Sequence, residues 1–401
     1  MNNHLFQARL IQLWALLSLL LICGCVKSTN LPVNTSGSRK ITVGFPSEIM
    51  DKEKIFKNAA LMSKYLDSCS LIQLETRPEC MIGEINKIFI HKARIYILDW
   101  KVTKSVFIFD LNGKCISTIA RIGHGPGEYI NITDMFIDPL NETLNIVAFA
   151  NRKIMTFSLD GKELLSETTY RYPIISMEAS REGSYMGYSG SGSIGKKINS
   201  TMITFKDRSL SNPSYRAFPL PEGGTINPSI ESALANCSGD IFYMQPLQNK
   251  IYKMDPDSIY LAYEFDFPSR NPDPNLTHEK LQNLPPDIMA KTIRRIMRFT
   301  LFSAGLIAEV NFESSSKLIF VTENLKNVEV IHTIVSPFLK FDFGRIVSLS
   351  AQNIITQINP RSVASALENK NFPEWAPFIK RYVRNPIKED DNPILCVYHL
   401  K

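Results

Sequence analysis

A unit that repeats every 47–48 residues restricts the fold of this chain more than any other feature of its sequence. Residues 85–114 (INKIFIHKARIYILDWKVTKSVFIFDLNGK) align with residues 132–162 (ITDMFIDPLNETLNIVAFANRKIMTFSLDGK), so that Gly113 corresponds to Gly161. Each unit alternates three strand-like runs with turns before a shared Gly-Lys. A period of this size is typical of one four-stranded blade of a β-propeller.

Short apolar runs and turn dipeptides explain the repeat physically. IYILD and VFIFD are rich in β-branched and aromatic residues, which suit strands buried between packed sheets. Asn112-Gly113 and Asp160-Gly161 tolerate the positive φ of tight hairpins. A fourth strand follows in each unit, as CISTIA in the first and as ELLSETT in the second. We therefore predict antiparallel blades of four strands.

Weaker copies of the unit continue towards the C-terminus. They lie in residues 175–210, 232–267, 316–335 and 341–400. If the non-β stretch at about 271–303 is left out, about 300 residues remain from position 66 to the end of the chain. At about 48 residues per blade, this length predicts six blades, and counting alone leaves seven open. The fold class predicted is all-β: a six-bladed β-propeller of four-stranded antiparallel blades, with a helical insertion near 277–300.

The two ends of the chain are predicted to close the ring. Residues 394–400 (ILCVYHL) are strand-like, and their partner strand would lie within 41–45 or within 71–75. A blade shared by both ends leaves no open strand edge, which a propeller must avoid.

The predicted insertion breaks the strand pattern. After Pro285-Pro286, apolar residues such as Ile293 and Ile296 recur at helical spacing, whereas Arg294 and Arg295 lie elsewhere on the helix. We predict an amphipathic helix that lies on the propeller. It would either cap the core or form a lid or basic rim over the central channel.

The N-terminus resembles that of a bacterial lipoprotein. Arg9 precedes an apolar stretch, residues 10–22, that is too short to span a bilayer and has the length of a signal-peptide core. It ends in ICGC, which resembles a lipobox whose Cys25 would receive lipid; the alternative is an ordinary signal peptide. The predicted domains are a signal peptide at 1–24, the lipidated Cys25 and a flexible tether at 25–46, and the propeller at 47–401.

Localisation and redox state follow from this prediction. Lipid on Cys25 would hold the chain to a membrane without a transmembrane helix. The tether lacks an acidic cluster, so we favour the periplasmic side of the outer membrane. The other cysteines form no CxxC pair; a Cys69–Cys80 disulfide is conceivable in an oxidising compartment, and buried apolar thiols are the favoured alternative.

The chain resembles the six-bladed β-propeller lipoproteins of Bacteroidetes, which are related in architecture to NHL-repeat propellers. The resemblance is carried by four segments: LIQLETRPECMIGEINKI, IYILDWKVTKSVFIFDLNGK, GHGPGEY and the ending DNPILCVYHLK. It implies a secreted propeller and implies little about activity.

One glycine-rich loop is the candidate ligand-binding site. Arg121, His124, Glu128 and Tyr129 place a cation, an acid and an aromatic face within nine residues, and Arg345 could join them at the channel. The alternative is a structural turn in which Tyr129 packs and Glu128 bonds to backbone.

Composition and motifs narrow the function. A net charge of +6 is spread along the chain without a basic run, so nucleic acid is not a predicted partner. The histidines lack metal-ligand spacing, and no nucleotide or hydrolase motif occurs; we predict neither metal nor cofactor. We favour a non-catalytic binding or scaffold module for a glycan, peptide or envelope protein. The alternative is a propeller hydrolase or lyase with its site at the central channel.

Overall fold

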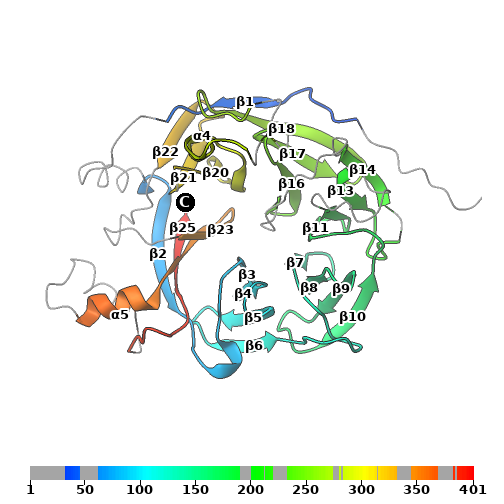
Figure 1. The fold of residues 1–401 in the computed structure, drawn as a ribbon, viewed down its shortest axis with the longest axis vertical. Helices are drawn as coiled ribbons and strands as arrows, with labels where there is room; N and C mark the ends of the chain where they lie inside the picture. The colour runs from blue at the N-terminus through cyan, green and yellow to red at the C-terminus, as the bar shows by residue number, and fades with distance from the viewer. Residues whose placement is uncertain are drawn as a thin grey trace, which may run out of the picture.

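Six β-sheets are arranged in a ring around a common centre (Figure 1). The computed structural model describes residues 32–45, 62–189, 200–211, 213–219, 233–273, 280, 283–313, 315–331, 345–368, 383 and 386–401. Each sheet contains one four-stranded antiparallel blade, numbered here I to VI along the chain, so the predicted six-bladed propeller is confirmed.

Strands follow one another from the inside of each blade to its outside. Blade I contains β3 (Lys87–His91), β4 (Arg94–Asp99), β5 (Ser105–Asp110) and β6 (Cys115–Ile119). Blade II contains β7 (Asp134–Asp138), β8 (Thr143–Ala148), β9 (Lys153–Phe157) and β10 (Leu164–Thr169). Blade III contains β11 (Ser176–Ala179), β12 (Tyr185–Tyr188), β13 (Ser200–Phe205) and β14 (Pro213–Pro219).

The second half of the ring repeats this order with additions at its edges. Blade IV contains β15 (Leu234–Cys237), β16 (Asp240–Gln245), β17 (Lys250–Asp255) and β18 (Ser258–Asp266). Blade V contains β19 (Ile296–Phe302), β20 (Gly305–Phe312), β21 (Ser315–Thr322) and β22 (Asn327–Ile331). Blade VI contains β23 (Arg345–Leu349), β24 (Asn353–Ile358), β25 (Ile394–Leu400) and, from the N-terminal side, β2 (Leu66–Gln73).

The hydrophobic core is divided among the interfaces between blades. A cluster of buried apolar side chains fills each of the six interfaces. In β4, Ile95 and Ile97 pack towards blade VI, whereas Tyr96 and Leu98 pack towards blade II. Successive side chains of a strand point to opposite faces, and both faces are buried here. This explains why the middle strands are apolar without interruption.

Glycine is required at the hairpins that the sequence analysis identified. Gly113 and Gly161 have φ values of 82° and 71°, in the left-handed region. A Cβ atom on Gly113 would lie 2.1 Å from the carbonyl oxygen of Gln73. The close approach joins the outer hairpin of blade I to β2, so a side chain there would push neighbouring blades apart.

The ring closes through strands from both ends of the chain. β25 pairs with β24 on one side and with β2 on the other, both antiparallel, with Leu71 opposite Cys396. Of the two predicted partner segments, the one at 71–75 overlaps β2. Residues 41–45 instead overlap β1 (Arg39–Thr42), which pairs in parallel with β18 at the outer edge of blade IV.

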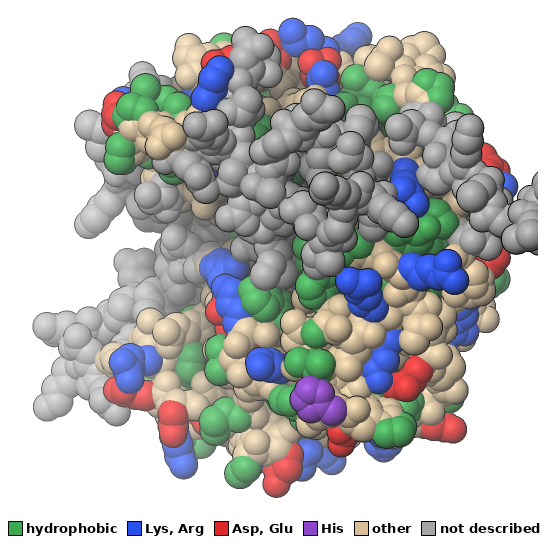
Figure 2. Space-filling model, turned by 45° about the vertical axis from the view of Figure 1, so that its right-hand side comes forward, with side chains coloured by type: hydrophobic (Ala, Val, Ile, Leu, Met, Phe, Trp, Pro, Cys, Tyr) green, Lys and Arg blue, Asp and Glu red, His purple; other side chains and the backbone are tan. Residues whose placement is uncertain are grey.

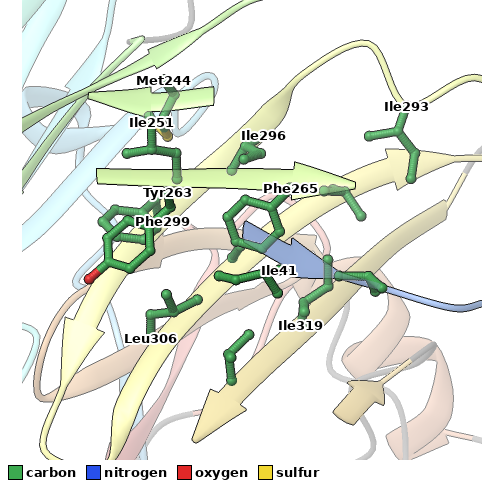
Figure 3. Close-up of a cluster of buried hydrophobic side chains, with 14 of the residues drawn as sticks. Ile41, Met244, Ile251, Tyr263, Phe265, Ile293, Ile296, Phe299, Leu306 and Ile319 are labelled. Atoms are coloured by element: carbon green, nitrogen blue, oxygen red, sulfur yellow. The ribbon is translucent and has the colours of Figure 1, made fainter. Parts of the chain in front are cut away.

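β1 lies in the segment for which the sequence analysis predicted a flexible tether. Ile41 and Val43 are buried, and Figure 3 shows Ile41 beside Phe265 of blade IV and near Ile319 of blade V. Burial of two β-branched side chains stabilises this strand by roughly 1.5–3 kcal/mol for each of them. The predicted signal peptide and Cys25 lie outside the described residues.

Within the described residues, the helical insertion ends earlier in the chain than predicted. α4 (Pro286–Lys291) begins at the second proline of Pro285-Pro286 but has no buried residue, and Ile288 is exposed. Ile293 and Ile296 are buried in the interface between blades IV and V, and β19 begins at Ile296. The prediction of a helix to Thr300 is therefore wrong, because blade V needs these apolar residues in its inner strand.

Helical segments elsewhere in the described residues also lie outside the blades. η1 (Pro78–Cys80) is a single 3₁₀ turn before blade I, and α5 (Pro360–Glu368) follows β24 and extends away from the ring (Figure 1).

Candidate functional site

A cavity of about 490 Å³ lies at the centre of the propeller, where the six inner strands meet. Its wall combines amide side chains with aromatic and thioether ones, among them Asn86, Asn236, Gln352, Phe89, Trp100 and Met297. Ligand pockets in proteins are typically about 300–1,000 Å³ in volume and mix apolar walls with a few polar groups. The cavity is therefore a candidate ligand site.

Three charged side chains from consecutive blades meet in the wall of this cavity. The ammonium group of Lys87 on β3 lies 2.7 Å from Asp134 Oδ1 on β7 and 2.9 Å from Glu178 Oε1 on β11. The side chain of Lys87 is 21 % exposed, whereas Asp134 and Glu178 are buried. We call these three residues the channel cluster.

Further hydrogen bonds complete the channel cluster and extend it to a fourth blade. Asp134 Oδ2 accepts a bond of 3.0 Å from the backbone N–H of Met177. Glu178 Oε2 accepts one of 3.3 Å from Asn236 Nδ2 on β15. Because every carboxylate oxygen has a donor, the cluster holds blades I to IV together in one polar network.

Burial and charge act in opposite directions on the channel cluster. Burial by itself would lower the pKa of Lys87, but Asp134 and Glu178 outweigh it and hold that pKa above its ordinary value. Burial raises the pKa of Glu178, and the nearby Lys87 only partly opposes it. Lys87 is therefore held in its charged form, and Glu178 is protonated more readily than an ordinary glutamate.

Other cations in the cavity wall also have partners. Arg298 on β19 lies 2.6 Å from Oε2 of Glu309, which is buried. Arg181, in the turn after β11, donates from its backbone N–H to the carbonyl oxygen of Gly239 and from its guanidinium to that of Ser238. These residues therefore connect neighbouring strands and blades.

The sequence analysis missed the channel cluster, although one signal for it was present. Lys87 and Asp134 are 47 residues apart and occupy the same position of the repeat, near the start of the inner strand. A charged residue at an otherwise apolar strand start, in two successive units, indicates a polar position at the centre of a ring. Glu178 could not be aligned so easily, because the third unit is shorter and weaker.

The predicted Arg121–Tyr129 loop connects β6 to β7 and directs its main polar groups to its own backbone. Tyr129 is buried, and its hydroxyl donates to the carbonyl oxygens of Lys104 at 2.8 Å and Ile119 at 3.1 Å. Burial raises the pKa of Tyr129 to about 12. Glu128 Oε2 accepts a bond of 2.8 Å from the N–H of Gly125. These contacts agree with a structural turn.

The other predicted site residues either contact groups outside the predicted set or are exposed. Arg121 stacks its guanidinium over the ring of Phe157, 5.5 Å from the centroid, and His124 is exposed. Arg345 lies at the start of β23 and forms an ion pair of 3.7 Å with Glu84. The described residues that line the cavity include none of the five predicted ones. Ligand binding by these five residues stays a prediction.

Clusters of metal-binding groups in the described residues and patches of charge on a face of the molecule are two other kinds of candidate site. On the face seen in Figure 2, blue Lys and Arg side chains are spread among acidic and neutral ones. Within the described ranges, no three His, Cys, Asp or Glu side chains gather as metal ligands would. None of the helices placed by the structure is long and apolar enough to cross a bilayer.

Comparisons with known proteins place the chain in a family. Residues 47–399 match the family described as "Domain of unknown function (DUF4934)". A Bacteroides fragilis protein whose name describes it as exported has a similar structure, with a TM-score of 0.69 and 15% identity over 90% of this chain and 100% of that chain.

Two further solved structures are more distant. A DUF4221 family member from Bacteroides vulgatus has a TM-score of 0.46 and 10% identity, over 84% of this chain and 97% of that one. Virginiamycin B lyase from Staphylococcus aureus has a TM-score of 0.39 and 12% identity, over 68% and 76%. No curated protein matches the chain.

Proposed function

The chain belongs to the DUF4934 family, and we propose that it is a non-catalytic binding module of the cell envelope that takes a neutral glycan in its central cavity. The observation that carries the proposal is a cavity of about 490 Å³ whose wall combines hydrogen-bonding and aromatic side chains. A similar fold in a protein named as exported supports an envelope location.

The charges in the cavity wall favour a neutral ligand. Lys87 already contacts two carboxylates, so the channel cluster carries a net negative charge when Glu178 is ionised and none when it is protonated. Arg298 is paired with Glu309. An anionic ligand would therefore meet no uncompensated cation at Lys87 or Arg298 and would lose its hydration there without compensation. The guanidinium of Arg181 donates to the backbone carbonyl oxygen of Ser238, and it is the cation in the wall that the anionic probe below tests.

Hydroxyl groups fit the polar capacity that remains. An ammonium group has three donors, of which Lys87 uses one for Asp134 and one for Glu178. The third donor can serve a hydroxyl or carbonyl oxygen. Trp100 and Phe89 supply apolar surface of the kind that packs against sugar rings.

Thermal unfolding in the presence of defined ligands tests the cavity. Maltotriose, cellotriose and mannotriose are the neutral probes, trigalacturonate is the anionic probe, and a capped trialanine peptide is the alternative. At ten times its Kd, a bound sugar is expected to raise Tm by roughly 2 °C. A shift with trigalacturonate but with none of the neutral probes would contradict the proposal.

A plugged cavity provides the matched control. Ala351, in the turn after β23, lines the cavity, whereas Ala150, in the turn after β8, is exposed and does not. Ala351→Trp is expected to abolish the Tm shift and Ala150→Trp to preserve it. Equal shifts in both variants would place binding elsewhere, with the Arg121–Tyr129 loop as the next candidate.

Anchoring through Cys25 is tested separately. We propose that lipid on this residue holds the propeller to the outer membrane, with the periplasmic side favoured. Cys25→Ser should move the full chain from the membrane fraction to the soluble fraction and abolish labelling by radioactive palmitate. Cys23→Ser, two residues away, should leave both unchanged.

Catalysis in the channel is the second candidate. It is favoured by the raised pKa of buried Glu178, because a protonated carboxyl can act as a general acid. Incubation of each probe with the protein, followed by chromatography, separates the candidates. A binding module returns the probe intact, whereas a hydrolase or lyase shortens it.

A further inference from the structure

Two cysteine side chains meet at the seam where the ring closes. Sγ of Cys69 on β2 lies 3.1 Å from Sγ of Cys396 on β25, although 327 residues separate them in the chain. Both thiols are free in the structure. These two strands join the N-terminal and C-terminal parts of the chain in blade VI, so the sulfur pair lies at the place where the ring must hold together.

Strand register explains how the sulfurs meet. Cys69 is opposite Tyr398, and Cys396 is opposite Leu71, so the two cysteines are diagonal neighbours on one face of the sheet. The right-handed twist of a sheet shortens one diagonal on each face. On the opposite face of the sheet, Ser70 and His399 are the corresponding diagonal pair, and Ser70 Oγ lies 3.1 Å from His399 Nε2.

The surroundings of the pair are unequal. Cys396 is fully buried in the cluster between blades V and VI, whereas Cys69 is partly exposed. Burial raises the pKa of the Cys396 thiol well above its ordinary value. A reagent from solvent therefore reaches the Cys69 thiol first, and the buried Cys396 thiol reacts second, with Cys69.

We propose that Cys69 and Cys396 form a disulfide bond that closes the propeller ring covalently when the chain meets an organic disulfide as oxidant. The sulfurs need to approach by about 1 Å to reach the S–S bond length. This pairing differs from the Cys69–Cys80 bond considered in the sequence analysis. It goes beyond the proposed function, because it needs neither the cavity nor a ligand.

Thiol–disulfide exchange supplies a balanced reaction. The Cys69 thiolate attacks one sulfur of the oxidant, which forms a mixed disulfide and releases one thiolate. Cys396 then loses its proton to that thiolate, attacks Sγ of Cys69 and displaces the second thiolate, which takes the proton lost by Cys69. The two cysteine sulfurs lose two electrons, and the oxidant gains them as it becomes two thiols.

Peptide mapping of the full chain tests the bond directly. The folded protein is incubated with oxidised glutathione, alkylated without reduction and cleaved after Lys, Arg and Glu. Because Glu75 lies between Cys69 and Cys80, the fragments separate these two cysteines. The expected product is residues 65–75 linked to residues 390–401. Recovery of both fragments singly alkylated from oxidised, folded protein would overturn the proposal.

Thermal stability provides a second, independent measurement. A bond that closes a long loop stabilises by restricting the unfolded chain, so oxidation should raise Tm by roughly 5 °C. Cys69→Ser, at the partly exposed position, should lose this increase, and Cys396→Ala should lose it as well. Cys237→Ser, in the interface between blades IV and V, should keep it. An equal increase in Cys69→Ser would overturn the proposal.

Discussion

The channel cluster and the Arg121–Tyr129 loop both gather polar side chains, but they do so in opposite ways. In the loop, the Glu128 carboxylate bonds to a backbone N–H three residues away. In the channel cluster, Lys87, Asp134 and Glu178 come from three blades and contact one another. The comparison shows that a segment rich in polar residues can use them to hydrogen-bond its own backbone. The polar groups of the channel cluster, in contrast, come from residues that are far apart in sequence.

The largest effect is expected when the channel cluster loses its cation. Lys87→Met leaves two buried carboxylates without a counter-charge, so the free energy of unfolding should fall by about 3–5 kcal/mol. Urea denaturation measures this loss. Lys92→Met is the matched control, because Lys92 pairs with Glu142 at the surface and should cost less than ~1 kcal/mol. Equal losses would mean that the cluster contributes no more than a surface pair.

The pH dependence of Lys87→Met sharpens the same comparison. Burial raises the pKa of Glu178, so ionisation of this carboxyl in the folded state lowers the free energy of unfolding. This loss of stability disappears as pH falls through that pKa. Without Lys87 the loss is larger. The stability gap between wild type and Lys87→Met should therefore narrow from pH 8 to pH 5, by up to ~1.4 kcal/mol for each unit by which the substitution raises the pKa of Glu178 further. A gap that widened over this range would contradict the charge-based explanation.

A smaller effect is expected for the buried hydroxyl of the loop. Tyr129→Phe removes the donor to two carbonyl oxygens and should lower the free energy of unfolding by about 1 kcal/mol. Tyr260→Phe, at a position that is 39 % exposed, is the control and should change little. A loss above the one seen for Lys87→Met would reverse the ranking of the two regions.

The smallest effect is expected for the exposed histidine of the loop. His124→Ala should change the free energy of unfolding by less than about 0.5 kcal/mol. If the cavity binds the ligand, this variant also keeps the sugar-dependent Tm shift. Loss of that shift, with stability unchanged, would move the binding site from the channel to the loop.

Most of the architecture could be predicted because its causes are local. Gly113 and Gly161 stand in the hairpins where φ is positive, and residues 394–400 close the ring as a strand. The prediction failed where one spacing of apolar residues is compatible with both a helix and a strand. Ile293 and Ile296 fit a helix face, but the unfilled interface between blades IV and V buries them in and before β19.

The candidate site could be predicted only in part. The position shared by Lys87 and Asp134 can be found from the repeat, but their contact with Glu178 depends on how three blades are placed side by side. Likewise, the sequence predicted the closing strand at residues 394–400 that contains Cys396, but neither predicted partner segment contains Cys69. The meeting of the two sulfurs depends on a diagonal of the register between β2 and β25.

The order of amino acids alone was enough for the repeat, for most of the strands and for the hairpins, because alternation of apolar residues and turn chemistry act over a few neighbours. It predicted six blades and left seven open, and the ring in the structure decided between them. That order was not enough for the partners of the charged and sulfur-containing side chains. Those partners follow from ring closure, which brings residues separated by tens or hundreds of positions within hydrogen-bond distance. Burial and Coulomb forces act on the distances that result, and these exist only in the folded ring.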